Sequence, residues 1–229
     1  IPVKPEQEIK TCVGVDVGIK KLATLSNGDL IVNPRFDQQS ERRLKIRQKR
    51  LSRKKKGSKN KKKAVNRVAR IHQKIRRQRQ DYQWKVAKRI AESADLIVFE
   101  DLNIKGMKSR CQPKWDDEKQ RYLQNNQSAK SQLNKAISDA SWYSLKLKTK
   151  YQASKLGNRV AEMNPRKTSQ ECSQCGYVSP NNRDGEKFVC ESCGHHEDAD
   201  INAGIVIGNR AIKQLNLSST KLLVVSQKV

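Results

Sequence analysis

Four cysteines near the C-terminal end constrain the local fold more tightly than any other feature of the chain. They form two Cys-x-x-Cys pairs, Cys172 with Cys175 and Cys190 with Cys193, separated by fourteen residues, and a glycine follows each pair. This spacing is typical of a tetrahedral zinc site, and four thiolates leave no open position for catalysis. We therefore expect a structural Zn²⁺ in a ribbon over residues 171–194, with each glycine letting backbone N–H groups turn toward the sulfur atoms.

Two alternatives to a four-cysteine site are open at this stage. The cysteines could form disulfides, although the N-terminus lacks the apolar region of a secretory signal. His195 and His196 directly follow the second pair and could serve as alternative ligands. The remaining Cys12 and Cys111 are most simply a buried apolar residue and a loop thiol.

The positive charge of the chain is concentrated in one segment. The 229 residues carry 49 lysines and arginines against 23 acids, which gives a formal net charge of +26. Residues 41–90 hold 23 of the basic residues and only two acids, Glu41 and Asp81, so this segment alone has a net charge of +21. A merely solvated helix would contain interspersed acids, and their scarcity indicates a nucleic acid as the partner.

Apolar residues recur through this basic segment at helical spacing. Steps of three, four and seven mark one face of a helix, here at Leu44, Leu51, Val65, Val68, His72, Ile75, Tyr82, Val86 and Ile90. The turn-forming residues 56–60 divide two helices, so we predict an antiparallel helical hairpin over residues 37–92 whose apolar stripe docks on the main body. Nucleic-acid contacts are predicted for Arg42, Arg43, Arg47, Arg50, Arg53, Lys54, Lys55, Lys56, Arg67, Arg70, Arg76 and Arg77.

Hydropathy excludes a membrane-spanning protein. The longest apolar run, residues 222–225, is far shorter than the roughly 18 residues that a spanning helix needs. We expect a cytoplasmic prokaryotic protein without a membrane partner. Because the chain begins with Ile1 rather than Met, we also expect it to be a piece of a longer protein.

Short apolar runs predict a sheet around the basic segment. Cys12–Gly18, Leu22–Leu25 and Leu30–Val32 indicate a three-stranded antiparallel meander, with a type I′ turn at Asn27-Gly28 in which both central residues have positive φ. Leu96–Phe99 is apolar throughout, as expected for a strand covered on both faces, and Arg159–Met163 predicts a fifth strand.

The rest of the chain is less strongly patterned. Residues 104–130 are polar and have the composition of a flexible loop. A single amphipathic helix is predicted from Leu133, Ile137, Ala140, Leu147 and Tyr151. In the tail, residues 218–229, the run 222–225 could be a short edge strand or an apolar patch.

Three carboxylates occupy positions where an acid calls for an explanation. Asp16 lies inside an apolar strand, where burial costs on the order of several kcal/mol unless the group is paired or binds a metal. Glu100 ends the fourth strand, and Asp200 begins a predicted helix, where an acid also has a structural role as a cap. If the strands are neighbours, these carboxylates could converge on two Mg²⁺ ions and support phosphodiester cleavage.

Four motifs strengthen this interpretation. They are Gly14-Val-Asp16-Val-Gly18, Phe99-Glu100-Asp101-Leu-Asn103, Thr168-Ser-Gln-Glu-Cys172-Ser-Gln-Cys175-Gly and Asp198-Ala-Asp200-Ile-Asn202-Ala. Their order, together with the basic stretch 42–63, resembles the RuvC nuclease region of TnpB, a family of RNA-guided nucleases encoded by insertion sequences. Compact Cas12 effectors share this nuclease region. The resemblance covers nearly the whole chain and implies an RNase H-like α/β fold, with a mixed sheet, flanking helices and the zinc ribbon inserted before the last helix.

The resemblance also implies roles for particular residues. Asp16, Glu100 and Asp200 would be catalytic and would hold two Mg²⁺ ions, with Asp198 as the second candidate for the third position. Residues 1–170 would form the nuclease core, residues 104–130 a mobile lid, and residues 195–229 the last motif, the C-terminal helix and the tail. The partners implied are a guide RNA and a DNA target that is single-stranded in the active site.

The chain departs from the family pattern in two respects. Gly204 stands where an alanine is usual, which we expect to loosen the last helix slightly. The upstream wedge and recognition domains of the family are missing from this chain.

Two other functions stay open on the sequence. A nucleic-acid-binding regulatory module that does not cleave would have been free to lose at least one of the three acids. A transposase that performs strand transfer would use the same fold and metals. The motifs do not separate TnpB from compact Cas12 and set no oligomeric state.

Overall fold

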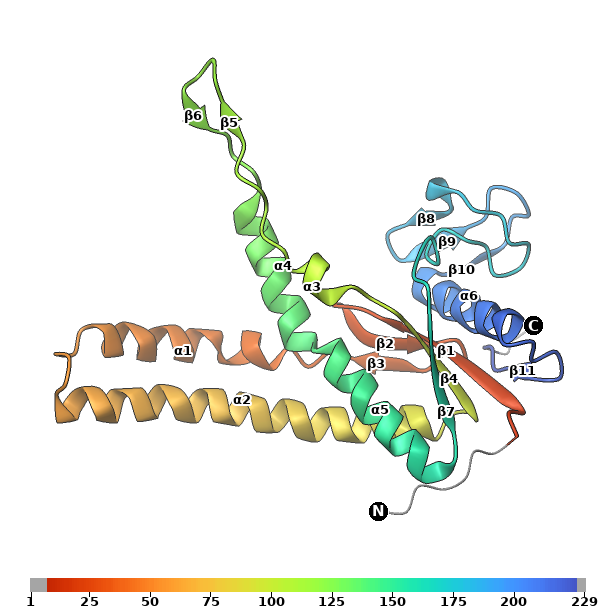
Figure 1. The fold of residues 1–229 in the computed structure, drawn as a ribbon, viewed down its shortest axis with the longest axis horizontal. Coiled ribbons are helices and arrows are strands. Elements are labelled where there is room, and N and C mark those ends of the chain that lie inside the picture. Colours follow the sequence, from red (N-terminus) through yellow and green to blue (C-terminus); the bar gives the residue numbers. More distant parts are fainter. Residues whose placement is uncertain (1–7, 226–229) are drawn as a thin grey trace. The chain divides into compact units, whose positions relative to one another are not determined.

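The computed structural model describes residues 8–225, which divide into two compact units (Figure 1). One unit contains the residues up to Asn33 and from Val86 onward, and the other contains Pro34–Lys85. Within residues 8–225, none of the helices combines the length and the apolar character that crossing a membrane requires.

The first unit is built on a mixed sheet. Its main strands lie in the order β3-β2-β1-β4-β7 and span Thr11–Val17 (β1), Lys21–Leu25 (β2), Leu30–Val32 (β3), Leu96–Glu100 (β4) and Arg159–Met163 (β7). The strands β1, β2 and β3 form an antiparallel meander, whereas β1, β4 and β7 run parallel. The predicted meander, the buried fourth strand and the fifth strand are therefore confirmed.

One face of the sheet is covered by α6 (Ala199–Gln214), which approaches β1 very closely. Glycines allow this approach: a Cβ atom on Gly14 would lie 1.9 Å from the carbonyl oxygen of Gly204 and 2.8 Å from the backbone nitrogen of Gly208. Gly204 therefore belongs to the contact between helix and strand, a role that its expected loosening effect did not anticipate. The buried apolar cluster on this face contains Cys12, Leu96, Val98, Met163, Ile207 and Ala211.

The opposite face is covered by α5 (Trp142–Leu156), which lies against β7. Lys146 and Lys150 of this helix both bind the carboxylate of Glu162 in β7. Because successive side chains of a strand alternate between faces, Glu162 points away from the α6 cluster that holds Met163. The sheet thus has an α6 face, which carries Gly14, and an α5 face.

Residues 127–156 form two helices rather than the single helix predicted. α4 (Gln127–Ala140) ends at Ser141, whose left-handed φ of 55° breaks the helix before α5 begins. Leu133, Leu147 and Tyr151 of the predicted stripe are exposed. The break resets the buried face, which consists of Ile137, Asp139 and Ala140 in α4 and of Trp142, Leu145, Thr149 and Ala153 in α5.

The segment 104–130 contains regular structure that its loop-like composition did not predict. It holds α3 (Ile104–Met107), a small hairpin of β5 (Trp115–Asp116) and β6 (Arg121–Tyr122), and the first turn of α4. The rings of Trp115 and Tyr122 pack edge-to-face across the hairpin, with 5.0 Å between their centroids. This aromatic pair stabilises the hairpin. The polar residues around it gave the segment the composition of a loop, so the hairpin was not predicted.

The turn between β2 and β3 is not the predicted type I′ turn. Gly28 has a φ of 87°, but Asn27 is not among the residues with positive φ. The N–H of Gly28 donates to the carbonyl of Leu25 (2.9 Å), and the N–H of Leu25 donates to that of Asp29 (3.0 Å). Residues 26–29 therefore connect the strands, with Gly28 at the left-handed position.

The C-terminal segment adds a short edge strand, β11 (Lys221–Leu222), which pairs in parallel with Thr11–Cys12. Beyond it, the N–H of Val225 donates to the carbonyl of Ser26 at 3.1 Å. Of the two interpretations of the tail, the edge strand is the correct one for residues 221–222. Residues 226–229 of the predicted tail lie outside the described residues.

The second unit is a helical hairpin whose two helices, α1 (Phe36–Ser52) and α2 (Lys59–Ala91), run antiparallel, as predicted; α2 extends past this unit at its C-terminal end. Their ends meet where Asp37 binds Arg79 at 3.1 Å and where the rings of Phe36 and Tyr82 lie 6.0 Å apart.

The apolar stripe predicted for α2 is correct only in part. Ile75, Val86 and Ile90 are buried as expected, whereas Val65 is 45% exposed. His72 is also exposed, and its neighbour Ile71 is buried in its place. The stripe is therefore one residue earlier at this turn than the sequence suggested.

A small three-stranded sheet precedes α6. A 3₁₀ turn at Pro180–Asn182 leads to β8 (Arg183–Asp184), β9 (Lys187–Val189) and β10 (His196–Asp198), in the order β10-β9-β8. β10 pairs with β9 and leads directly into α6.

Candidate functional site

The parallel pairing of β1 and β4 brings two of the predicted acids to the same edge of the sheet. Val15 is paired with Phe99, so the residues that follow, Asp16 and Glu100, lie at the carboxyl ends of adjacent strands. Strand alternation places both on the face that carries Gly14, which is the face covered by α6. Both side chains are only partly exposed.

The start of α6 contributes the third predicted acid. Asp198 is the N-cap: its Oδ1 accepts two backbone N–H groups of the first turn, including that of Asp200 at 2.9 Å, and its Oδ2 accepts Lys21 Nζ at 2.8 Å. Asp200 follows in the first turn, where its Oδ1 accepts from Arg183 at 2.9 Å and its Oδ2 lies 3.4 Å from Lys21 Nζ. The hydrogen bonds of the cap occupy Asp198, which makes Asp200 the better candidate.

The three acids act on one another electrostatically. The pKa of Asp16 is raised to about 8, first because burial disfavours its charged form and then because the charges of Glu100 and Asp200 repel it. Arg183 and the backbone N–H of Val17 oppose this rise only in part. A buried carboxyl group with two acidic neighbours is stabilised in its ionised form by an added cation.

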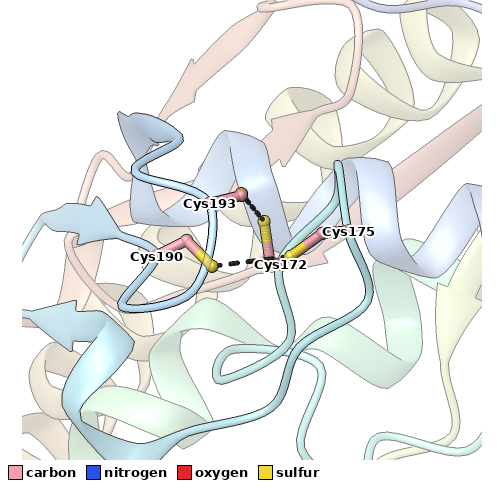
Figure 2. Close-up of side chains that lie close together, drawn as sticks. All are labelled: Cys172, Cys175, Cys190 and Cys193. Atoms are coloured by element: carbon pink, nitrogen blue, oxygen red, sulfur yellow. Dashed lines mark hydrogen bonds between the residues drawn. The ribbon is translucent and has the colours of Figure 1, made fainter.

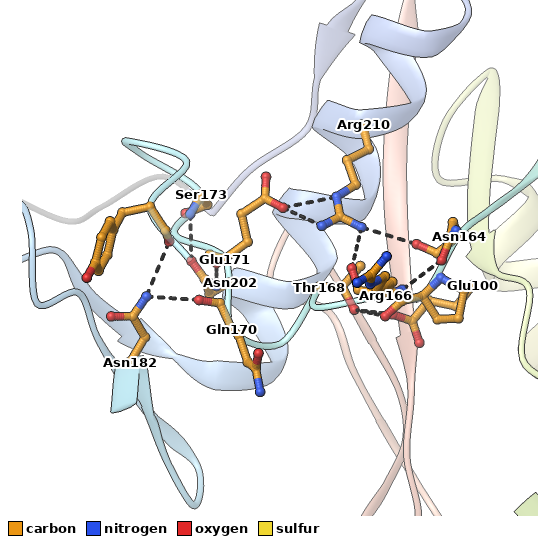
Figure 3. Close-up of polar contacts among 12 residues, drawn as sticks. Glu100, Asn164, Arg166, Thr168, Gln170, Glu171, Ser173, Asn182, Asn202 and Arg210 are labelled. Carbon is orange, nitrogen blue, oxygen red and sulfur yellow. Dashed lines mark hydrogen bonds and ion pairs between the residues drawn. The ribbon is translucent and has the colours of Figure 1, made fainter. Parts of the chain in front are cut away.

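Glu100 is held in place by the segment that leads to the first cysteine pair (Figure 3). Thr168 Oγ1 lies 2.5 Å from Glu100 Oε1 and donates to it. Burial raises the pKa of Glu100, and the Thr168 hydrogen bond and the positive charge of Arg210 in α6 oppose the rise. Arg210 is itself fixed by Glu171 and by the backbone carbonyls of Asn164 and Arg166.

The donor atoms of the acidic group suit a hard divalent cation. Mg²⁺ prefers oxygen ligands and is usually held by one or two carboxylates together with water and phosphate oxygens. In this structure Lys21 and Arg183 supply the positive charge next to Asp200. The acids are not gathered as tightly as the cysteines: within residues 8–225, only the four cysteines form a group whose potential ligand atoms all lie within 4.8 Å of one another.

The four predicted cysteines do converge (Figure 2). The Sγ atoms of Cys172 and Cys193 are 3.7 Å apart, and those of Cys175 and Cys190 are 3.6 Å apart. Four sulfur atoms about 2.3 Å from one zinc ion in a tetrahedron would be separated by about 3.8 Å, whereas a disulfide requires about 2.05 Å. All six cysteines are free, so the disulfide alternative is wrong, and neither histidine belongs to the group.

Backbone N–H groups point at the sulfur atoms, as expected from the glycines after each pair. Burial opposes ionisation of Cys190, but the N–H groups of Cys193 and Ser192 and two neighbouring thiols outweigh it and lower the pKa of Cys190 to about 7. Gly176 and Gly194 adopt φ values of 75° and 71°. Burial instead raises the pKa of Cys172 to about 12, and the pKa of Cys193 is also raised, so a metal that binds this group has to displace protons from the thiols.

Asn202 ties the cysteine site to the acidic site and was given no role by the sequence (Figure 3). It is fully buried in α6, its Oδ1 accepts the N–H of Ser173 (3.0 Å), and its Nδ2 donates to the carbonyl of Glu171 (2.8 Å). A buried amide with both ends bonded to backbone fixes the first cysteine turn on the helix that carries Asp200. Its place in the last motif was the only signal in the sequence.

Arg183, Lys21, Thr168 and Arg210 were also missed as site residues. Their partners are acids or carbonyls that lie far away in the chain, so no local spacing identifies them.

The predicted nucleic-acid contacts lie on the hairpin unit. Eleven of these twelve side chains are exposed, and the twelfth, Arg47, is partly buried. The helices therefore leave the basic groups accessible to a polyanion.

Comparison with known families finds two matches. Residues 1–110 match the OrfB_IS605 family, described as "Probable transposase", and residues 142–207 match "Cas12f1-like, TNB domain". The "Putative RNA-guided DNA endonuclease InsQ" of Escherichia coli K12 is 33% identical over 210 residues, which cover 88% of this chain and 51% of that protein. A "Putative RNA-guided DNA endonuclease" of Streptomyces pristinaespiralis is 32% identical over 207 residues, covering 88% and 45%. The chain spans about half the length of these curated relatives.

Solved structures show a similar fold. The cryo-EM structure of a Cas12f1–sgRNA–target DNA complex aligns with a TM-score of 0.55 at 20% identity, covering 92% of this chain and 52% of that chain. A CRISPR-Cas12f ternary complex aligns with a TM-score of 0.58 at 21% identity, covering 91% and 40%. At these identities the likeness concerns the fold.

Proposed function

The chain belongs to the TnpB family, and from this premise we propose that it is the nuclease region of an RNA-guided DNA endonuclease. The proposal is best supported by the electrostatic proximity of Asp16, at the end of β1, to Glu100 at the end of β4 and to Asp200 at the start of α6. The strand order, with a meander followed by parallel strands and a helix across the α6 face, supports an RNase H-like RuvC fold.

The proposed domains follow the sequence boundaries. Residues 1–170 form the nuclease core, with the hairpin 37–92 inserted and the lid at 104–130. The ribbon 171–194 and the segment 195–229 complete the site. The longer relatives support the proposal that the full-length protein also contains upstream domains that grip the guide.

In the proposed reaction Asp16, Glu100 and Asp200 would hold two Mg²⁺ ions, which would supply activation of water and stabilisation of the leaving oxygen of the phosphodiester. Asp16 and Glu100 approach from the sheet and Asp200 from the helix, so the site is enclosed by rigid elements. Asp16 must lose its proton to act as a ligand. The bond from Thr168 fixes one oxygen of Glu100 and orients the other.

The remaining features supply binding and support. The four cysteines would hold a structural Zn²⁺, and Asn202 would transmit the rigidity of that ribbon to α6. The basic residues of the hairpin would bind the backbone of the guide–target heteroduplex, and the target DNA strand would enter the acidic site single-stranded. The names of the relatives, which include RNA-guided DNA endonucleases and a complex with sgRNA and target DNA, support these partners.

The proposal can be tested by measuring the cleavage of labelled target DNA by the full-length protein loaded with its guide RNA and Mg²⁺. Glu100→Gln is expected to lower the cleavage rate by at least about a hundredfold, because the loss of even an outer-shell partner commonly costs 10- to 100-fold. Asp101→Asn is the matched control, since Asp101 is the exposed acid that directly follows Glu100. Equal cleavage by Glu100→Gln and the parent would refute the site.

The family description as a probable transposase supports a second candidate, strand transfer by the same acids. An assay with labelled donor and unlabelled target DNA separates the two. Joined products that require Asp16 would favour the transposase, and cut products alone would favour the endonuclease.

A further inference from the structure

A pocket of about 700 Å³ lies beyond the carboxyl end of β4, with its first lining residue two positions after Glu100, and the proposed reaction gives it no role. It is lined by Leu102, Asn103, Ile104, Lys105, Lys108 and Tyr143. Five of these residues directly follow the strand that ends at Glu100. Tyr143 follows Trp142, whose Nε1–H donates at 3.1 Å to the carbonyl of Gly18, two residues after Asp16. The pocket is therefore built by the segment that leaves β4 and by the first turn of α5, which Trp142 ties to the segment that leaves β1.

The chemistry of the lining suits a nucleotide. Tyr143 is 59% exposed, and Lys105 and Lys108 are exposed beside it. An accessible aromatic ring stacks on a base, and ammonium groups attract the flanking phosphates.

The pocket is already shaped by local hydrogen bonds. Asn103 Oδ1 accepts the N–H of Gly106 at 2.9 Å and so fixes the turn that carries Lys105. Asn134 of α4 donates its Nδ2–H to the carbonyl of Lys108 at 2.8 Å. Trp142 anchors the start of α5, so these contacts position the side chains that line the pocket.

We infer that this pocket is a subsite for the DNA strand that is cut: one base stacks on Tyr143, and the neighbouring phosphates bind Lys105 and Lys108. The inference rests on the proposed function, since it assigns the substrate strand of the same site. Binding there fixes where the strand crosses the three acids, and thus selects which phosphodiester is presented to them.

Photocrosslinking locates the strand. The full-length protein with guide RNA and target, carrying Asp16→Ala to prevent cutting, is irradiated with an oligodeoxythymidylate probe that contains 5-iododeoxyuridine. A crosslink at Tyr143, identified by mass spectrometry, is expected and should persist in Tyr151→Leu. Tyr151 is the matched control because it is an exposed tyrosine on the same helix, 4.4 Å from Lys155 Nζ and outside the pocket. A crosslink confined to the basic hairpin would overturn the inference, and an equal yield with an oligouridylate RNA would overturn the assignment to DNA.

Affinity gives the second readout. Tyr143→Leu should weaken binding of the same probe about tenfold, since stacking on one aromatic side chain commonly contributes at least this much, while Tyr143→Phe should bind like the parent. Lys105→Gln with Lys108→Gln should reduce the slope of log affinity against log salt by about 0.7 for each phosphate that the variant no longer neutralises. If Tyr143→Leu binds like the parent, or Tyr151→Leu weakens binding equally, the subsite is wrong. Intact cleavage in the Asp16-containing protein would then show that the proposed function survives.

Discussion

The two ends of the parallel strands β1 and β4 shift the pKa of a carboxyl group in opposite directions. At the amino end, Asp95 accepts the N–H and the hydroxyl of Thr11, both at 2.8 Å, and the N–H of Lys10 at 3.1 Å. Burial opposes ionisation there, but these hydrogen bonds outweigh it and lower the pKa of Asp95. At the carboxyl end, burial and two acidic neighbours raise the pKa of Asp16 to about 8.

The difference separates structure from function. Asp95 has its charge stabilised entirely from within the fold, where it joins the start of β1 to the start of β4. Asp16 is next to Glu100 and Asp200, and the surrounding groups do not fully compensate its charge. A site in which the charge of an acid is not fully compensated is suited to bind an external cation. Clustered carboxyl groups with shifted pKa values are typical of functional sites.

The sharpest test of the comparison is to neutralise each acid and measure DNA cleavage by the guide-loaded, full-length protein. Asp16→Asn should lower the rate by at least about a hundredfold, because it removes a metal ligand. Asp95→Asn should retain the parent rate at a temperature where it is folded, because it lies at the opposite end of the strands. A comparable loss of rate in folded Asp95→Asn would break the comparison.

A smaller effect on the cleavage rate is expected from removing the Thr168 hydroxyl group, which binds Glu100 at the carboxyl end of β4. Thr168→Val removes the hydrogen bond to Glu100 and raises its pKa further, so cleavage should fall about tenfold and its pH profile should move to higher pH. Thr149→Val is the control, since its buried hydroxyl bonds only the helical carbonyl of Leu145 at 3.0 Å. A uniform loss of rate at every pH would indicate a structural role for Thr168 instead.

Metal affinity should depend on pH because Asp16 must release a proton to bind a cation. Below the pKa of about 8, the apparent affinity for Mn²⁺ should rise by up to about tenfold per pH unit and then level off. Titration of the protein with Mn²⁺ in buffers between pH 6 and 9 checks this, and the Asp16→Asn variant should show a much weaker dependence. Affinity that falls as the pH rises would contradict the assignment.

The smallest effects are on stability, and they have opposite signs. Asp95→Asn should lower the free energy of unfolding by about 1 kcal/mol at pH 8, because exposed and partly buried donors lose a charged acceptor. Asp16→Asn should raise it by about 1–3 kcal/mol at pH 8 without divalent ions.

The pH dependence of these effects follows from the direction of each pKa shift. The folded protein binds the proton of Asp16 more tightly than the unfolded chain, so ionisation of Asp16 costs stability as the pH rises from about 4 to about 8. The advantage of Asp16→Asn should therefore shrink at pH 5.5. The stabilising effect of Asp95 should instead be lost as the pH falls through its lowered pKa. Urea unfolding at pH 8 and 5.5 measures the change for Asp16→Asn, and a further measurement at about pH 3 measures the loss for Asp95.

The sequence predicted those parts of the fold that depend on local patterns. Alternation and apolar runs identified β1 to β4 and β7, and the cysteine spacing identified the four thiols that converge. The break at Ser141 was missed because the helix stripe assumes one continuous buried face, and the exposed Leu147 belongs to a different face from Ile137. Thr168 and Asn202 could not be assigned because their partners become neighbours only after the sheet has formed.

The glycine contact between β1 and α6 sets the scale of the acidic site. A single methyl group on Gly14 would overlap the carbonyl oxygen of Gly204, only 1.9 Å away, and α6 would have to move outward. Asp200 is carried by that helix, so the outward step would widen the gap that separates it from Asp16. Backbone atoms in contact cannot move aside as side chains do. The distance between the carboxylates of Asp16 and Asp200 therefore depends on the absence of Cβ atoms at these glycines. A substitution that adds a Cβ atom at Gly14 or Gly204 should change this distance and, with it, the size of the cation that the carboxylates can bind.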